Sequence, residues 1–331
     1  MALWWPYLSG LAMMALAFGT VVFYGYRRPT TWLGRWSGIP SRQKAEDVEP
    51  AKTLWDWLSL LGVPMAVALF GIGYSIWARE TDQQISNERT MDDALKAYFD
   101  AIGTLLTIPE SPPSDSTIRT TTLVRSHTLT ILNQIDGHRK ATVVDFLHKS
   151  GLITTTVGAH NPIISMAEAN LQQADLAEVM LNQVYFARVH LEDANLQWAF
   201  LIDANLQMAH LDRANLLGVK LFSSNLYGAD LPDTDLTDAY LNGADLTGAK
   251  LQRADLSSAD LSKTRLEGVD FSGATMYGAD LSGASLVGAD LTGVIGLTQK
   301  QLDSTQTYVD AEGLPEHLSP DSRPLPWSYP D

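Results

Sequence analysis

Cysteine is missing from the 331-residue sequence, which excludes disulfide bonds, thiolate chemistry and zinc sites built on cysteine. The chain also lacks a glycine-rich phosphate loop, a nucleophile elbow and a helical His-Glu metal motif. Positive charge is scarce, and the net charge of −15 argues against a general nucleic-acid binder. We therefore expect a protein that is not an enzyme, uses no cofactor and binds no nucleic acid.

Two long uncharged runs stand near the N-terminus, at residues 7–26 and 57–77. Each has the length of about 20 residues that spans a bilayer as one helix. Aromatic residues flank both runs, as interfacial anchors do: Trp4, Trp5, Tyr7, Tyr24, Tyr26, Trp55 and Tyr74. We expect residues 1–78 to form two transmembrane helices, so that the lipid bilayer is one partner of an integral membrane protein.

The loop between the two runs is basic, with Arg27, Arg28, Arg35, Arg42, Lys44 and Lys52. The positive-inside rule places such a loop in the cytoplasm. Both termini are then expected outside the cytoplasm, together with the C-terminal half of the chain.

Residues 79–160 are expected to be helical, with a Pro- and Ser-rich linker near 109–116. An apolar stripe at helical spacing runs before the linker: Ile85, Ala94, Leu95, Tyr98, Ile102 and Leu105. It indicates either packing against the next helices or a coiled-coil seam. Two helices are predicted after the linker, one with Leu123, Leu129, Ile131 and Leu132, the other with Val143, Val144, Phe146 and Leu147 before a stop at Gly151.

A period of five dominates residues 169–293. A large apolar residue returns at every fifth position, and 22 of these 25 residues are Leu. A small residue, most often Ala, stands two positions earlier, and Asn or Asp often lies between, as in Ala204-Asn205-Leu206. Helices need apolar spacings of three and four, and strands a spacing of two, so this period predicts a solenoid.

The pattern resembles the pentapeptide-repeat family, whose consensus reads A(D/N)LXX. The resemblance implies a mainly β fold, a right-handed quadrilateral β-helix in which four pentapeptides form one coil. Residues 161–294 would then make about six coils in a rod roughly 30 Å long. The expected core includes Leu196, Leu206, Leu216, Leu226, Leu236, Leu246 and Leu256. The order of the segments is similar to that of membrane-anchored bacterial members, many of them cyanobacterial, in an inner or thylakoid-type membrane.

Glycine fills the last position of many later pentapeptides, such as Gly268 and Gly293, and predicts type II turns there. Earlier units carry larger residues, such as Gln173 and Trp198, and are expected to turn differently. Residues 295–331 are expected to hold a capping helix and an irregular tail. The string GLTQKQLDS resembles the closing helix of the family, with Thr298 as N-cap and Leu302 over the last coil.

His190, His210 and Asp230 are spaced to stack on successive coils. Two imidazoles near carboxylates could hold a divalent metal, but the residues favour a solvated ladder, and we expect no metal site. The Asn and Asp ladders, such as Asn195 with Asn215, indicate structure.

Large apolar residues also occupy outward positions. Met180, Phe200, Ile202, Phe222 and Tyr240 are predicted on one face, with Phe200 directly above Phe222, and Trp198, Leu217 and Tyr227 at neighbouring positions. Lys220 interrupts the strip with one charge. A contiguous apolar patch usually marks an interface. The cover could be a separate partner or a second copy, the protein's own helical segment, or a membrane.

We expect a membrane-anchored, non-enzymatic scaffold whose β-helix presents a protein-binding surface. The alternative comes from the DNA-mimicking branch of the family, acidic rods that bind DNA gyrase. The acidity of the repeat favours this alternative, and its bases and apolar face count against it.

Overall fold

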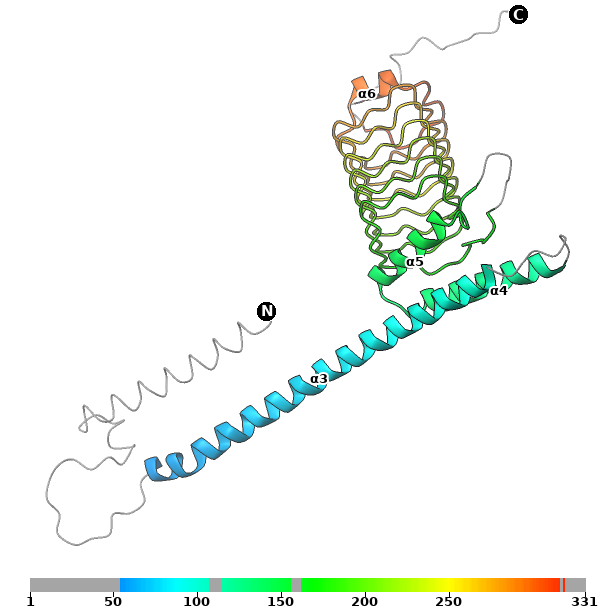
Figure 1. Ribbon diagram of the computed structural model, residues 1–331. Helices are drawn as coiled ribbons and strands as arrows, with labels where there is room; N and C mark the ends of the chain where they lie inside the picture. Colours follow the sequence, from blue (N-terminus) through cyan, green and yellow to red (C-terminus); the bar gives the residue numbers. More distant parts are fainter. Residues whose placement is uncertain (1–53, 107–114, 156–161, 316–317, 319–331) are drawn as a thin grey trace, which may run out of the picture. The chain divides into compact units, whose positions relative to one another are not determined.

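The computed structural model describes residues 54–106, 115–155, 162–315 and 318 (Figure 1). These residues include four helices: α3 (Leu54–Leu106), α4 (Asp115–Leu132), α5 (Gly137–Lys149) and α6 (Gln299–Ser304). The chain divides into two units, Met1–Asn87 and Glu88–Asp331, and the boundary falls inside α3.

In the first unit the structure describes the N-terminal part of α3, where large apolar side chains such as Val67 and Phe70 are exposed. Within the described part of the chain, no helix combines the length and apolarity needed to cross a bilayer. This finding does not support the span expected at 57–77, whose residues lie in the N-terminal part of α3. The span expected at 7–26 and the basic loop lie outside the described residues.

In the second unit the apolar stripe of α3 packs against α4 and α5. Tyr98 and Ile102 are buried, and the Tyr98 hydroxyl lies 2.9 Å from the Thr128 hydroxyl of α4. The rings of Phe99 and Phe146 meet edge to face at 4.9 Å between centroids. The stripe thus belongs to a helical core.

Two side chains expected in this helical core lie outside it. Ile85 is exposed, since it precedes the part of α3 that contacts the other helices. Leu123 is also exposed, because the buried face of α4 is made by Val124, Thr128 and Ile131.

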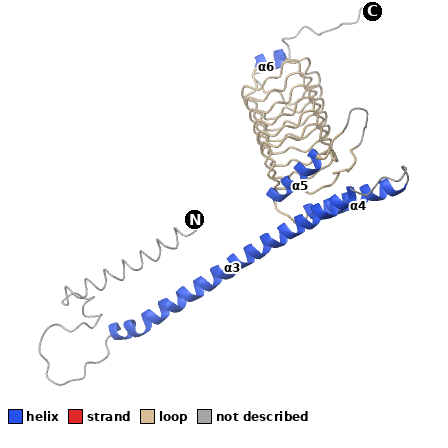
Figure 2. Ribbon diagram, in the orientation of Figure 1, coloured by secondary structure: helices blue, strands red, loops and turns tan. Residues whose placement is uncertain are grey.

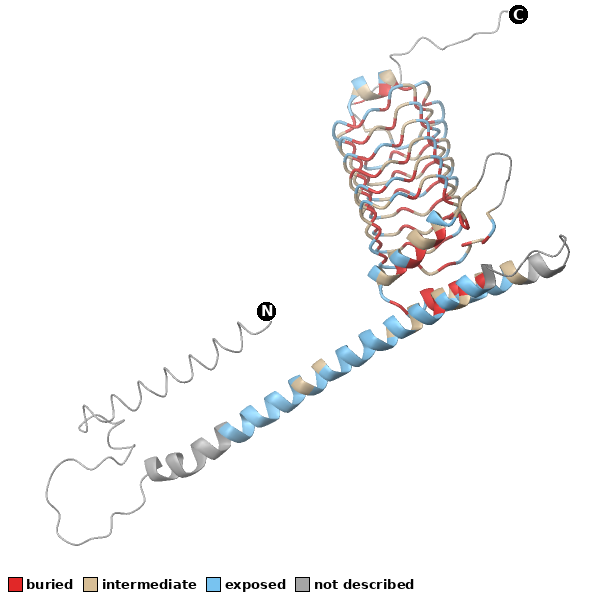
Figure 3. Ribbon diagram, viewed as in Figure 1, coloured by how far each residue is buried: buried red, intermediate tan, exposed pale blue. Residues whose placement is uncertain are grey.

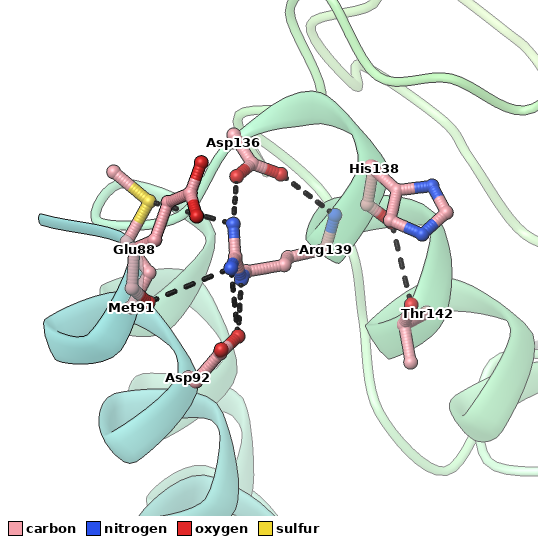
Figure 4. A network of polar contacts seen from close by, with 7 residues as sticks. All are labelled: Glu88, Met91, Asp92, Asp136, His138, Arg139 and Thr142. Atoms are coloured by element: carbon pink, nitrogen blue, oxygen red, sulfur yellow. Dashed lines mark hydrogen bonds and ion pairs between the residues drawn. The ribbon is translucent and has the colours of Figure 1, made fainter. Parts of the chain in front are cut away.

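Arg139 joins α3 to the start of α5 (Figure 4). Its guanidinium donates to Asp92 of α3 at 2.8 Å and pairs with Asp136. Asp136 is the N-cap of α5 and accepts from the Arg139 N–H at 3.0 Å. Partial burial raises the pKa of Asp136, but the hydrogen bonds from Arg139 outweigh it and hold the pKa below its ordinary value.

The repeat forms the predicted square coil, in which one residue of each pentapeptide bridges to the residue 20 positions later, as Asn195 does to Asn215. Each side contributes a single bridge, so the described residues contain no strand (Figure 2). The predicted core leucines are buried, at 0% or 1% exposure. Buried and more exposed positions alternate along the coils (Figure 3). Burying one Leu contributes about 1.5–3 kcal/mol.

The turns of the early and late coils share a positive φ at the last position of the unit. Gln173 has φ 58° and Trp198 57°, close to Gly218 at 64°. The prediction that early and late coils turn differently is therefore wrong as far as the sign of φ is concerned, since φ is positive in both. Regular backbone bonds, such as Trp198 N–H to the Leu217 carbonyl at 2.8 Å, offset the cost of about 1–2 kcal/mol for a left-handed residue.

Helix α5 covers the first coil and satisfies its open edge. Buried Lys140 donates to the Asn170 side chain at 3.1 Å and to the Gln172 carbonyl at 2.9 Å. The Gly137 carbonyl accepts from the Asp175 N–H at 3.1 Å. These contacts replace the missing neighbouring coil, and burial lowers the pKa of Lys140.

The coil extends beyond its predicted end at residue 294. Helix α6 forms as expected, with a capping box between Thr298 and Gln301 and with Leu302 fully buried. The coil then resumes, since Ser285 bridges Thr307 and Asp290 bridges Glu312. Helix α6 is therefore an insertion in the last coil, and residues after it complete the ladder.

Candidate interaction surface

One side of the coil, here called the Asn/Asp face, carries Asp175, Asn195, Asn215, Asp235 and Asp255 in register. Four of these side chains accept from the backbone N–H two residues later, as Asn215 does from Leu217 at 3.1 Å and Asp255 from Ser257 at 2.9 Å. The ladder between coils leaves this N–H unused. The Asn or Asp of the consensus therefore completes the backbone hydrogen bonding of its own unit.

The next side of the coil breaks this rule in its first four positions, where Met180, Phe200, Lys220 and Tyr240 bridge in register. The Met, Phe, Lys and Tyr side chains have no oxygen close to the backbone, so they cannot accept from the N–H two residues later as Asn and Asp do. The Ile202 N–H instead binds Asn182 of the neighbouring coil at 3.0 Å. No described residue accepts from the N–H of Asn182, Phe222 or Asn242. We call the surface made by Met180, Trp198, Phe200, Ile202, Lys220, Phe222 and Tyr240 the aromatic face.

Trp198 packs onto the backbone of Gly218 at the corner of the aromatic face. A Cβ added at Gly218 would lie 2.1 Å from the indole, so only glycine fits beneath it. The Lys220 ammonium lies 5.5 Å from the centroid of the Trp198 ring and 3.2 Å from that of Tyr240. The Phe222 and Tyr240 rings are 5.6 Å apart. Lys220 thus joins the aromatic cluster through cation–π contacts.

The structure places most of the predicted surface residues together. Met180, Phe200 and Tyr240 share one column, and Ile202 and Phe222 lie two positions further along their coils. The prediction that Phe200 lies directly above Phe222 is wrong, because Phe200 bridges Lys220 and Phe222 comes two residues later.

The remaining two predicted residues lie beside or away from the aromatic face. Leu217 lies under the Trp198 corner, where its carbonyl accepts from the Trp198 N–H. Tyr227 belongs to another side, where its carbonyl accepts from the Met208 N–H.

The aromatic face stays accessible to solvent although apolar. Met180 is 62% exposed, Trp198 40%, Tyr240 38% and Phe200 37%. The hydrogen bonds between α5 and the coil involve Asn170, Gln172 and Asp175, and the Asn182 carbonyl, which lies 2.9 Å from His148. The described helices therefore leave this face uncovered, which does not favour the expectation that the helical segment is its cover.

Stacked histidines mark a third side of the coil. The rings of His190 and His210 are parallel, with centroids 4.8 Å apart. Their nitrogen lone pairs lie in the ring planes, so they do not converge on one point between the rings. In the described ranges no group of three or more His, Asp or Glu residues has the geometry to hold a metal ion.

Carboxylates hold the imidazoles in this column. His190 Nδ1 lies 3.0 Å from Glu192, and His210 Nδ1 lies 3.3 Å from Asp230. Lys250 pairs with Asp230 at 2.7 Å. Pro232 has no N–H, which leaves the Asp230 carboxylate available for both neighbours. Between coils the column is therefore held by ring stacking and by contacts between charged groups.

Ion pairs of alternating sign follow the adjacent corner. Arg213 binds Asp193 with two hydrogen bonds of 2.7 and 2.8 Å, and Arg253 binds Asp233 with two of 2.6 Å. Hydrogen bonds from the arginines hold the pKa values of Asp193 and Asp233 below their ordinary value. Part of the negative charge of the coil is therefore neutralised by arginines on the neighbouring coils.

Comparison with known proteins agrees with the repeat pattern. Residues 169–293 match the family model described as pentapeptide repeats, in eight copies. No curated protein is a significant match to the chain.

Solved pentapeptide-repeat structures are also similar to the chain. They include trypsin-treated QnrB1, a plasmid-mediated fluoroquinolone resistance protein, with 20% identity and a TM-score of 0.29 over 44% of this chain and 78% of that one. HetL from the cyanobacterium Nostoc sp. strain PCC 7120 has 29% identity and a TM-score of 0.18, over 45% and 82%. A protein from the Arabidopsis thaliana thylakoid lumen has 26% identity and a TM-score of 0.26, over 40% and 74%.

Proposed function

Because residues 169–293 belong to the pentapeptide-repeat family, we propose that they form a non-enzymatic scaffold that binds another protein through the aromatic face. One observation carries this proposal. The coil needs a hydrogen-bond acceptor at the position before each leucine, where Asn or Asp usually stands, but the aromatic face has the exposed residues Met180, Phe200 and Tyr240 there. The exchange loses about 0.5–1.5 kcal/mol per hydrogen bond. An exposed apolar cluster that the fold does not require is typical of a protein interface.

The test replaces Phe200 and Tyr240 with Asn, the residue that the repeat favours at both positions. We expect the double variant to fold and to lose the proteins that co-purify with the solubilised wild-type chain. The matched control is Met208→Gln, which changes an exposed apolar residue, 46% accessible, on a different side of the coil. An unchanged set of partners in the double variant would contradict the proposal. A change in oligomeric mass alone, measured by analytical ultracentrifugation, would identify a second copy as the partner.

The paired carboxylates count against the DNA-mimic alternative. Such a mimic presents unpaired negative charge, whereas Asp193, Asp233 and Asp245 each bind an arginine of the neighbouring coil. No contact in the described residues favours that function.

We further propose that the N-terminal segment anchors the chain in a bacterial membrane, with the coil on the extracytoplasmic side. The proposal rests on the sequence, where uncharged runs of spanning length at 7–26 and 57–77 enclose a basic loop; the described part of α3 does not itself qualify as a span. The full chain should resist extraction from membranes by alkaline carbonate, and its C-terminus should be open to protease added outside the cytoplasm. Release into the soluble fraction would contradict the anchor, and protection from the protease would reverse the orientation.

A further inference from the structure

Lys220 occupies the centre of the aromatic face. It bridges Phe200 on one coil and Tyr240 on the other, and its ammonium lies over the Tyr240 ring. A partner that covers this face must therefore also cover a positive charge.

The charge of Lys220 has no counter-ion in the coil. Several other bases of the coil are paired one coil away, such as Arg213 with Asp193 at 2.7 Å and Arg265 with Asp245 at 2.9 Å. No carboxylate of a described residue lies within ion-pair distance of Lys220. Aromatic faces attract an ammonium but supply no hydrogen-bond acceptor comparable to an anion.

The absence of a counter-ion restricts what can bind. An all-apolar cover would bury an ammonium without an acceptor, which is strongly unfavourable. A carboxylate brought by the partner would meet Lys220 in a desolvated aromatic setting, where charged hydrogen bonds are strongest.

Acidic residues surround the cluster. Glu178 and Asp238 share the corner column of Trp198, Asp203 follows Ile202, and Asp260 bridges Tyr240. None of the four makes an ion pair with a described residue, and Glu178, Asp203 and Asp238 are exposed. The rim of the surface is thus negative around one positive centre.

We propose that the aromatic face binds a protein segment with one carboxylate between apolar side chains and with basic residues at its edges. This proposal rests on the proposed function and names the chemistry of the partner. The central carboxylate binds Lys220, the apolar side chains cover Phe200, Phe222 and Tyr240, and the basic edges meet the acidic rim.

The experiment selects displayed random dodecapeptides on the solubilised full chain and measures the affinity of the enriched peptides. We expect enriched sequences with a central Asp or Glu, apolar neighbours and terminal Lys or Arg. Lys220→Met should weaken their binding at least about tenfold. Lys263→Gln is the matched control, because Lys263 lies exposed near the same side without aromatic contacts and should leave the affinity unchanged.

A double-mutant cycle separates the charge pair from general disruption. Replacing the central Glu of the peptide with Gln should weaken binding to the wild type about tenfold but should change binding to Lys220→Met little. Enriched peptides that lack an acid, or that bind Lys220→Met as tightly as wild type, would overturn the inferred chemistry. If the peptides still depend on Phe200 and Tyr240, the proposed binding face itself would stand. A selection without enrichment, or with peptides indifferent to Phe200 and Tyr240, would overturn both.

Discussion

The Asn/Asp face and the aromatic face stand on adjacent sides of the same coil and share its architecture. Beneath both lie fully buried leucines, such as Leu216 and Leu221, and the same bonds between coils. They differ in the position before each leucine, where Asn215 binds a backbone N–H and Lys220 instead contacts aromatic rings. The comparison shows that inward positions build the coil, whereas this outward position can be exchanged for binding chemistry at a modest cost in stability.

The largest expected effect concerns what the two faces share. Leu226→Asp places a carboxylate at a position with no exposure to solvent, where no partner can satisfy it. We expect a loss of stability above about 4 kcal/mol, seen as the loss of cooperative thermal unfolding by circular dichroism. Leu226→Met, which conserves volume, should cost less than about 1.5 kcal/mol. A stable Leu226→Asp coil would contradict the role of the leucine column.

The second prediction tests how the aromatic face is held. Gly218→Ala forces a Cβ into the Trp198 ring, whereas Gly248→Ala adds one with nothing within 4 Å at a similar φ of +68°. Both variants should lose about 1–2 kcal/mol from the left-handed backbone, and Gly218→Ala about 1–3 kcal/mol more from the clash. Denaturant unfolding measures both losses, and the tryptophan emission should shift only in Gly218→Ala. Equal losses would show that the indole does not depend on Gly218.

Removing the Asn acceptor from the Asn/Asp face and adding one to the aromatic face should change the free energy of unfolding by smaller amounts and in opposite directions. Asn215→Ala removes the 3.1 Å bond to the Leu217 N–H and should lower the free energy of unfolding by about 0.5–1.5 kcal/mol. Met180→Asn gives the Asn182 N–H an acceptor while removing a side chain that is 62% exposed. That variant should be unchanged or more stable by up to about 1 kcal/mol. A clear destabilisation by Met180→Asn would mean that Met180 serves the fold.

The smallest effect concerns the ion pairs beside the Asn/Asp face. The pKa of Asp193 is lowered from 3.8 by Arg213, so the pair stabilises the fold above that pH and loses its contribution as the pH falls through the folded-state pKa. Arg213→Gln should therefore reduce the change in melting temperature below pH 3.8, most visibly at low salt. Lys263→Gln serves as the control, since Lys263 makes no ion pair with a described residue. Identical pH profiles for wild type and Arg213→Gln would remove the pair from the stability of the coil.

The aromatic face was only partly predictable from the sequence. The period of five brings Met180, Phe200 and Tyr240 into one column, because residues at the same position of successive coils must stack. By composition Lys220 interrupts the apolar strip, although its register places it between Phe200 and Tyr240. Its position over the Tyr240 ring depends on side-chain conformation, which a repeat pattern does not specify.

The coil can be predicted from the period alone, since the leucine column and the backbone ladder both repeat every five residues and require only local consistency. Features that depart from the period depend on tertiary contacts. Lys140 caps the first coil from a helix 30 residues away, and the coil resumes after α6 at Thr307. The tertiary structure also decided that Gln173 and Trp198 adopt the same positive φ as glycine. These features arise where contacts between distant segments outweigh local preference, and only the folded chain brings those segments together.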